Sequence, residues 1–212
     1  MACRSLALWA LVVAWACSFS PASAQNDSNG PITLKKIDDS LVTAPQYNYQ
    51  VNGPSLTSGP VPKWLQVEFS FDTDTDRDLL PEVTFRIYIE VQDLANPKDQ
   101  DGPAAVLTGE TTYVNLPNGR DQRGSFFVHP YTIRRFGGEN AFSNFKAKKN
   151  IRVEALIDGQ QIAFKDEHQD DANWVSTLKK IGSLVLPREM SPWLLVNPDR
   201  YPPIKLRGGN NS

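Results

Sequence analysis

The sequence predicts an all-β protein of the β-sandwich class. Apolar and polar residues alternate in two segments, residues 65–71 and 83–91. A period of two is typical of strands that bury one face. Further strand-like runs follow at a spacing of about ten residues, separated by turn-forming residues, as in β-sandwiches. The sequence lacks a strand–helix–strand alternation, so we do not expect a parallel-sheet enzyme fold.

The first 24 residues have the pattern of a secretory signal peptide. Arg4 precedes an apolar run at residues 6–16, which is too short to span a bilayer as a helix. Ala22-Ser23-Ala24 follows and has the small residues of a signal cleavage site. We therefore expect residues 1–24 to be removed on export.

The two cysteines limit the chemistry of the exported chain. Cys3 and Cys17 both precede the cleavage site, so export would leave no disulfide, thiolate metal site or cysteine nucleophile. The alternative is a lipoprotein in which Cys17 carries the lipid. Trp15 argues against it, because a lipoprotein signal has a small residue at that place.

Composition narrows the class further. The chain has 212 residues, 40% of them hydrophobic, and a formal net charge of -2. This composition is typical of a globular protein, and the chain lacks the net positive charge of a dedicated nucleic-acid binder. We expect no transmembrane segment after signal cleavage. The protein would be exported to the periplasm or be outer-membrane-associated or extracellular, and its oligomeric state is left open.

The exported chain divides into a leader, a body and a tail. Residues 25–61 are poor in apolar periodicity, so we expect a flexible leader with one short strand near 32–34. The body spans residues 62–206. Residues 207–212 form a tail that we expect to be frayed.

The remaining elements of the body are also predicted from local patterns. Further strands are expected at residues 105–116, 125–129, 151–157 and 161–164. Asp158-Gly159 joins the last two and predicts a type I′ hairpin, because both central residues of that turn have positive φ. One short helical segment is expected within residues 131–150, where Asn140 is a candidate cap. Residues 174–186 are interpreted as a strand or a short helix.

We expect no metal site and no cofactor. Aspartates alternate from Asp72 to Asp78, but Arg77 and Val83 occupy the places where an EF-hand loop has glycine and glutamate. His168 lies among carboxylates without a second histidine at ligand spacing. Weak calcium binding by the aspartate-rich loop is left open.

We also expect no catalytic residues. The chain has two histidines, His129 and His168, and lacks a Gly-x-Ser-x-Gly elbow and a phosphate-binding loop. The protein is therefore predicted not to be an enzyme. A carboxylate pair for glycoside hydrolysis stays open, because 24 acidic residues offer many pairs.

Two sets of residues are candidates for binding a partner. The most basic stretch contributes Arg134, Arg135, Lys148 and Lys149, which could meet an acidic protein surface. The aromatic residues expected on outward faces are Trp64, Tyr88 and Tyr113. They are candidates for a protein-binding or sugar-stacking platform, or else they cover the core. An exposed sheet edge would be a further binding device, because it can accept another strand.

A series of segments in fixed order also carries a family resemblance. The segments are residues 64–69 (WLQVEF), 107–116 (LTGETTYVNL), 119–120 (GR), 128–136 (VHPYTIRRF) and 197–201 (NPDRY). Together they resemble the Amuc-type pilus-like proteins of verrucomicrobial bacteria. The resemblance covers residues 62–206. It implies an exported, single-domain, immunoglobulin-like protein encoded beside type IV pilus assembly genes, and it brings no catalytic residues.

The sequence thus predicts an immunoglobulin-like β-sandwich with one short helical segment. Its expected function is non-enzymatic protein binding or assembly at a pilus or other cell-envelope machine. The expected partners are cell-envelope or pilus-assembly proteins. The alternative is a secreted carbohydrate-binding or carbohydrate-active protein, which would use exposed aromatic rings and carboxylates.

Export makes a testable prediction about the N-terminus. The intact mass of the native protein should correspond to a chain that begins at Gln25, because cleavage is expected after Ala24. A chain that begins at a lipidated Cys17 would contradict this prediction and identify a lipoprotein.

Overall fold

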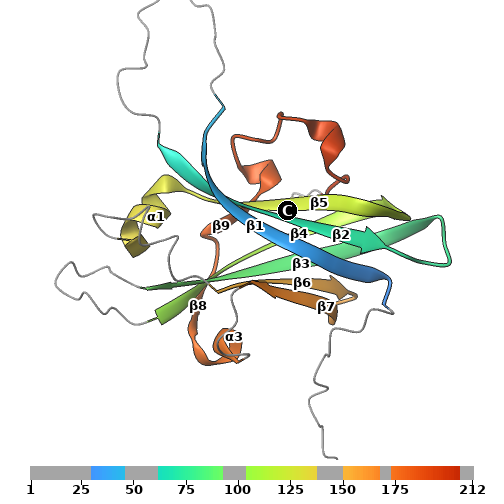
Figure 1. Ribbon diagram of the computed structural model, residues 1–212, viewed down its shortest axis with the longest axis horizontal. Helices are drawn as coiled ribbons and strands as arrows, with labels where there is room; N and C mark the ends of the chain where they lie inside the picture. Colours follow the sequence, from blue (N-terminus) through green and yellow to red (C-terminus); the bar gives the residue numbers. More distant parts are fainter. Residues whose placement is uncertain (1–29, 46–61, 93–103, 138–149, 168–172, 206–212) are drawn as a thin grey trace, which may run out of the picture.

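The computed structural model describes residues 30–45, 62–92, 104–137, 150–167 and 173–205, which form a sandwich of two sheets (Figure 1). Sheet A has the order β1-β2-β5-β9, and sheet B has the order β7-β6-β3-β4-β8. The strands of sheet A are β1 (Ile32–Thr43), β2 (Lys63–Thr73), β5 (Gly119–Val128) and β9 (Val185–Pro187). Those of sheet B are β3 (Leu79–Gln92), β4 (Ala104–Pro117), β6 (Ile151–Ile157), β7 (Gln160–Glu167) and β8 (Lys179–Ile181). The predicted β-sandwich is confirmed.

Short helices complete the described part of the chain. They are α1 (Pro130–Gly137), α3 (Trp174–Thr177) and two 3-10 turns, η1 (Arg188–Met190) and η2 (Pro198–Arg200). No helix among the described residues is long and apolar enough to cross a membrane.

The core lies between the sheets and is built from the alternating strands. In β2 and β3 the apolar residues point inward, so that Phe69, Phe71, Phe85 and Ile87 are buried. The Phe85 ring of sheet B lies 4.9 Å from the Phe69 ring and 4.7 Å from the Phe71 ring of sheet A, between centroids. The expected inward orientation of Phe69, Phe85 and Ile87 is therefore confirmed.

Strand β1 corrects the predicted leader. We expected residues 25–61 to be flexible, but residues 32–43 pair antiparallel with the whole of β2. A bulge between Leu34 and Lys36 shifts the pattern, so Ile32, Leu34 and Ile37 are the buried apolar residues of β1. This shift breaks the period of two and hides the strand in the sequence. The body therefore begins before residue 62.

Two local predictions have different outcomes. The Asp158-Gly159 turn joins β6 to β7 with φ angles of 50° and 78°, as expected for the predicted hairpin. Helix α1 begins at Pro130, since proline is favoured in the first turn of a helix, and the rest of α1 lies within residues 131–150, where a helical segment was expected. Asn140 lies outside the described residues, and residues 174–186 contain α3, β8 and the start of β9.

Strand directions give the sandwich two different ends. At one end β2 begins at Lys63, β5 ends at Val128 and α1 follows; we call this the α1 end. At the opposite end the connections are short, such as the single residue Asn118 between β4 and β5. Connections at the ends of a sandwich are where binding residues usually lie.

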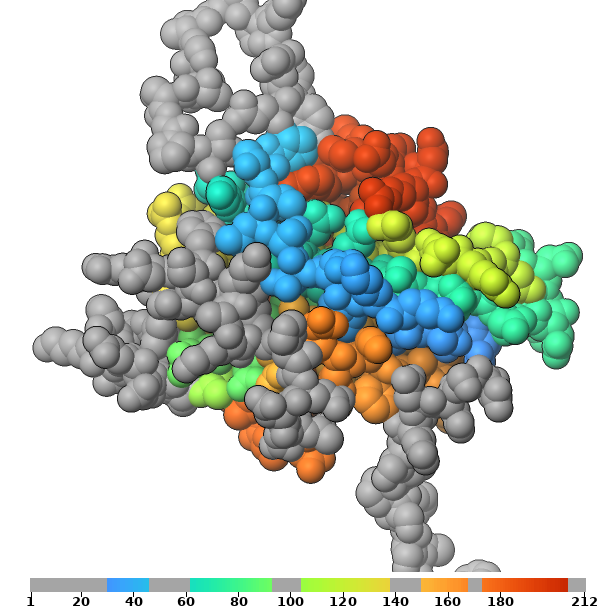
Figure 2. All heavy atoms as spheres, viewed as in Figure 1, coloured from blue at the N-terminus to red at the C-terminus, as the bar shows by residue number. Residues whose placement is uncertain are grey.

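Residues 188–205 form a strap across the outer face of sheet A (red in Figures 1 and 2). Near its end the strap pairs with the edge of β4. The Val114 N–H donates to the Pro203 carbonyl (2.9 Å), and the Lys205 N–H donates to the Thr112 carbonyl (2.8 Å). The strap therefore connects the outer layer of sheet A to the edge of sheet B.

The contact between the sheets predicts the effect of a core substitution. Phe85→Ala should reduce the free energy of unfolding by about 3–5 kcal/mol, because Phe85 is fully buried between two other rings. Leu79→Ala is a control in the same strand, since the Leu79 side chain is 46% exposed. Urea unfolding of both variants checks this. Equal losses would contradict the assigned orientation of β3.

Candidate docking surface

A chain of ring contacts runs across the α1 end on the outer face of sheet A. The Phe127 and Trp193 rings stack with 4.5 Å between centroids, and Trp193 meets Trp64 edge to face at 5.6 Å. Trp64 meets His129 at 4.6 Å, and His129 stacks on Tyr131 at 5.2 Å. The contacts therefore connect the strap to α1.

The strand pattern explains why these rings meet. In β2, Leu65 points into the core, so Trp64 points to the outer face of sheet A. In β5, Phe126 and Val128 belong to the core, so Phe127 also points outward. Trp193 of the strap covers Phe127, which is only 1% exposed. The strap thus forms a second layer over apolar residues that sheet A leaves outside the core.

His129 links the ring chain to the start of α1. Its carbonyl accepts the Ile133 N–H (3.1 Å), and its Nδ1 atom accepts the Tyr131 N–H (3.2 Å). Because Nδ1 is an acceptor, the proton of the neutral ring lies on Nε2. These bonds fix the direction in which Tyr131 leaves the helix.

Helix α1 presents a basic face to solvent. Ile133 and Phe136 are buried against the core, and the period of the helix therefore leaves Arg134 and Arg135 exposed. The Arg135 guanidinium lies 4.9 Å from the centroid of the Phe136 ring. The Tyr131 side chain, one turn earlier, is 73% exposed.

The strap adds exposed apolar side chains beside the ring chain. Leu194 and Leu195 follow Trp193 and are 45% and 72% exposed. The exposed residues at the two ends of this series of ring contacts are together called the docking patch; they are Tyr131, Arg134, Arg135, Leu194 and Leu195. Exposed tyrosine, arginine and large apolar residues are common at protein interfaces.

Glu68 anchors the far side of the strap. Its carboxylate accepts a hydrogen bond from the Tyr201 hydroxyl (3.0 Å) and pairs with Arg200 (3.3 Å) and with Arg123 of β5. Burial raises the pKa of Tyr201, and the nearby Glu68 charge raises it further. The Arg188 guanidinium lies 4.5 Å from the centroid of the Tyr201 ring. The turn that carries Leu194 and Leu195 is therefore held on both sides.

The structure places the predicted binding residues in different environments. Arg134 and Arg135 are exposed, whereas Trp64, Tyr88 and Tyr113 are 7%, 4% and 2% exposed. The three aromatic residues thus offer no open platform, and their burial agrees with the alternative that they cover the core. Trp64 lies on an outer face as expected, whereas Tyr113 belongs to the core between the sheets. Lys148 and Lys149 lie outside the described residues.

Each buried aromatic residue has its own cover. Trp64 lies beneath Trp193 of the strap. Tyr88 packs with Trp174 of α3, and its hydroxyl donates to Glu154 (3.0 Å). Tyr113 points into the core, 5.7 Å from the Phe85 ring, and burial raises the pKa of its hydroxyl.

Sequence reasoning missed Tyr131, Leu194 and Leu195. Pro130 was the available signal for Tyr131, because a helix that begins at this proline places residue 131 in its first turn. Nothing local marks the leucines as exposed, since an apolar run also fits a buried strand.

The acidic residues do not form a metal site that the structure describes. Asp72 pairs with Lys35 (3.1 Å) and accepts the Asp121 N–H (3.0 Å). Among the described residues no group of three potential ligands is arranged to hold a metal ion. His168 lies outside the described residues, and weak calcium binding by the aspartate-rich loop stays a prediction.

Comparisons with known proteins place the chain in a family. Residues 23–207 match the family model of the Amuc-type pilus-like proteins, and the chain belongs to this family. Membership in this family indicates that the protein is pilus-associated.

A crystal structure of a protein from Akkermansia muciniphila matches the fold with a TM-score of 0.68 and 22% sequence identity. The match covers 83% of this chain and 93% of that chain. It shows that the two chains share the β-sandwich fold. No match was found among curated proteins.

The ring contacts of Trp193 predict that this residue stabilises the strap. Trp193→Ala should reduce the free energy of unfolding by about 2 kcal/mol, because it removes contacts with Phe127 and Trp64. Leu195→Ala should change it by less than about 0.5 kcal/mol, because that side chain is largely exposed. Thermal unfolding of both variants compares them, and a neutral Trp193→Ala would show that the strap does not depend on stacking.

Proposed function

We propose that the protein is an exported, non-enzymatic docking component that binds other proteins of the pilus or cell envelope through the docking patch. The observation that carries this proposal is the combination of exposed apolar side chains with two exposed arginines at one end of the sandwich. Family membership supports an association with pilus proteins. The signal-like residues 1–24 support export to the periplasm or beyond.

The composition of the patch suits a protein partner with an acidic rim. Tyr131, Leu194 and Leu195 offer apolar area that a partner can remove from water. Arg134 and Arg135 are exposed on α1, and exposed charges of one sign can steer a partner of the opposite charge. A charged rim of this kind raises association rate and fixes orientation more than it adds affinity.

Side-chain docking is favoured over strand addition. Sheet A ends at β1 and at the short β9, and sheet B ends at β7 and the short β8. The long edge strand β1 carries a bulge at Leu34–Lys36 and charged residues such as Lys36 and Asp38. Bulges and charges on an edge strand hinder pairing with another strand. Binding through the side chains of the docking patch needs no backbone pairing, so bulges and charges on an edge strand do not hinder it.

Carbohydrate binding is the weaker interpretation. The aromatic rings that would have formed a sugar platform, Trp64, Tyr88 and Tyr113, are buried. Tyr131 is the one ring of the ring chain with a largely exposed side chain. A single exposed ring offers little stacking area compared with the platform that this interpretation required.

Charge reversal in α1 tests the proposal. In native envelopes, crosslinking of the protein should recover pilus-assembly or other envelope proteins. Arg134→Glu combined with Arg135→Glu should lower that recovery by about tenfold, because two steering charges then repel an acidic partner. The measurement is quantitative mass spectrometry of crosslinked proteins.

The control reverses two charges at the opposite end of the sandwich. Arg77→Glu with Arg120→Glu changes the net charge by the same amount, and both side chains are exposed away from α1. Recovery should stay near that of the unchanged protein. Equal losses in both variants would indicate a general charge effect, and recovery that survives the α1 reversal would exclude the docking patch.

A further inference from the structure

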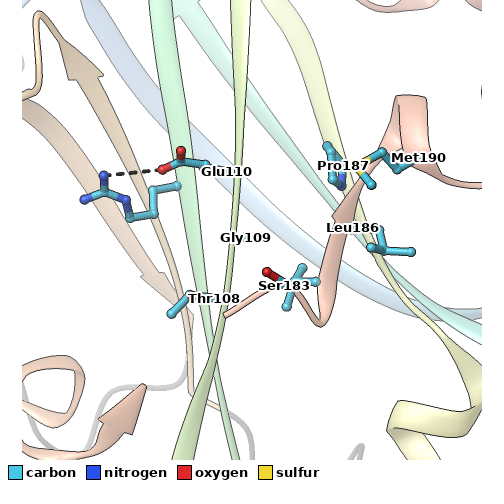
Figure 3. A pocket seen from close by; sticks show the side chains of 9 residues that line it. Thr108, Gly109, Glu110, Ser183, Leu186, Pro187 and Met190 are labelled. Carbon is cyan, nitrogen blue, oxygen red and sulfur yellow. Dashed lines mark hydrogen bonds and ion pairs between the residues drawn. The ribbon is translucent and has the colours of Figure 1, made fainter. Parts of the chain in front are cut away.

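A notch lies at the edge of β4. Strand β8 covers this edge as far as Leu107, which pairs with Ile181, and the strap covers it from Thr112, whose carbonyl accepts the Lys205 N–H. Between the two covers lies a cavity of about 260 Å³ (Figure 3). We call this cavity the notch; it is lined by residues 108–110 of β4 together with residues of β9 and η1.

The backbone of Glu110 points its hydrogen-bonding groups into the notch. The Val114 N–H and the Thr112 carbonyl bond to the strap, so both residues direct their backbone groups away from β3. Backbone direction alternates along a strand, so Glu110 directs its N–H and C=O the same way. Among the described residues, none forms a backbone hydrogen bond with Glu110 on this side. The notch therefore contains a donor and an acceptor at the spacing of one β-bridge.

The strap shows that this edge accepts short segments. Tyr113 and Ile204 form an isolated antiparallel bridge, which backbone bonds of 2.9 Å and 2.8 Å flank. The register between β3 and β4 also runs past Glu110 without a shift, in contrast to the bulged edge strand β1. The bulge that hinders pairing on β1 therefore has no counterpart here, and an extended segment can pair opposite residues 109–111.

The charges beside the notch favour a basic residue in such a segment. Glu110 lies opposite Arg86 of β3, which in turn lies opposite Glu154 of β6. The Arg86 guanidinium lies 3.4 Å from the Glu110 carboxylate, whose side chain is 50% exposed (Figure 3). This row has two carboxylates and one guanidinium. A lysine or arginine that faces Glu110 from an added strand is therefore a favourable cross-strand neighbour.

The other side of the notch is apolar. Leu186, Pro187 and Met190 line it, and Met190 is 61% exposed (Figure 3). Gly109 faces this side, where a Cβ would lie 2.5 Å from the Val185 carbonyl oxygen, so glycine lets β9 approach β4. In an added strand the residues before and after the basic one point to the apolar side. The notch therefore matches an apolar–basic–apolar sequence.

We propose that the notch binds an extended apolar–basic–apolar segment of another protein as an antiparallel β-bridge to Glu110. The Glu110 N–H donates to the carbonyl of the basic residue, and the N–H of that residue donates to the Glu110 carbonyl. The basic side chain pairs with the Glu110 carboxylate, and its neighbours cover Leu186 and Met190. The notch shares no residue with the docking patch, so this contact goes beyond the proposed function and does not depend on it.

Titration with synthetic peptides tests the charge preference. The probes are Ac-Thr-Val-Lys-Val-Thr-NH2 and the same peptide with glutamate in place of lysine, and the readout is the amide NMR spectrum of the exported protein. The lysine peptide should shift the Gly109 and Glu110 amides and bind at least about tenfold more tightly, because facing like charges repel. Equal affinities, or shifts confined to other parts of the protein, would overturn the proposal.

Charge reversal at residue 110 gives the reciprocal test. Glu110→Lys should reverse the preference, so that the glutamate peptide binds more tightly than the lysine peptide. Asp38→Lys is the matched control, because Asp38 is an exposed carboxylate on β1 of the other sheet. It should keep the original preference. An equal change in both variants would show a general charge effect and contradict a site at Glu110.

Two backbone measurements separate strand pairing from an ion pair alone. Methylation of the lysine amide nitrogen in the peptide removes the N–H that donates to Glu110, so its affinity should fall by at least about tenfold. Saturation with the unmodified peptide should slow hydrogen exchange of the Glu110 amide by at least about tenfold. The Val114 amide is the internal control, since it already donates to Pro203. Full affinity of the methylated peptide, or unchanged exchange at Glu110, would exclude the bridge.

The free protein provides the last check. Without peptide, the Glu110 amide should exchange at least about tenfold faster than the Val114 amide, because no described residue offers it a backbone acceptor. Equal protection of the two amides before peptide is added would show that the notch is already filled, within the chain or by a second copy. That result would overturn binding of another protein there.

Discussion

The packing of Phe85 against Phe69 and Phe71 is the contact on which the rest of the structure depends. It joins a strand of each sheet at ring distances below 5 Å between centroids. The Phe69 ring in turn lies directly on the backbone of Gly124, where any side chain would collide with it. Apolar residues on the outer face of sheet A, such as Trp64 and Phe127, lie outside this core and need a separate cover, which the strap supplies.

Much of the fold could be predicted because a strand that buries one face has an apolar residue at every second position. Strands β2 and β3 and their core residues Phe69 and Phe85 follow from that pattern. Strand β1 does not, because the bulge after Leu34 changes which residues point inward. The pattern therefore fails where the strand itself is irregular, although its pairing with β2 is complete.

The candidate site was harder to predict, and the reason is distance along the chain. Exposure of Arg134 and Arg135 follows from the short helix alone, since its other face is buried. Burial of Trp64 depends on Trp193, and the anchor between Glu68 and Tyr201 joins residues 133 positions apart. Local patterns indicate that a residue lies on an outer face, but they cannot indicate whether a distant segment covers it.

The strap also sets the conformational cost of covering Leu194 and Leu195 in the proposed docking patch. The Leu194 N–H donates to the Ser191 carbonyl (3.2 Å) and the Val196 N–H donates to the Trp193 carbonyl (3.0 Å), so the turn has internal bonds. Stacking on Phe127 holds one side of this turn, and the Glu68 cluster holds the other. A turn restrained in this way loses little conformational entropy when a partner covers Leu194 and Leu195. Exposed leucines on an unrestrained loop would present the same apolar area with a larger ordering cost, and this difference favours a docking role for the strap.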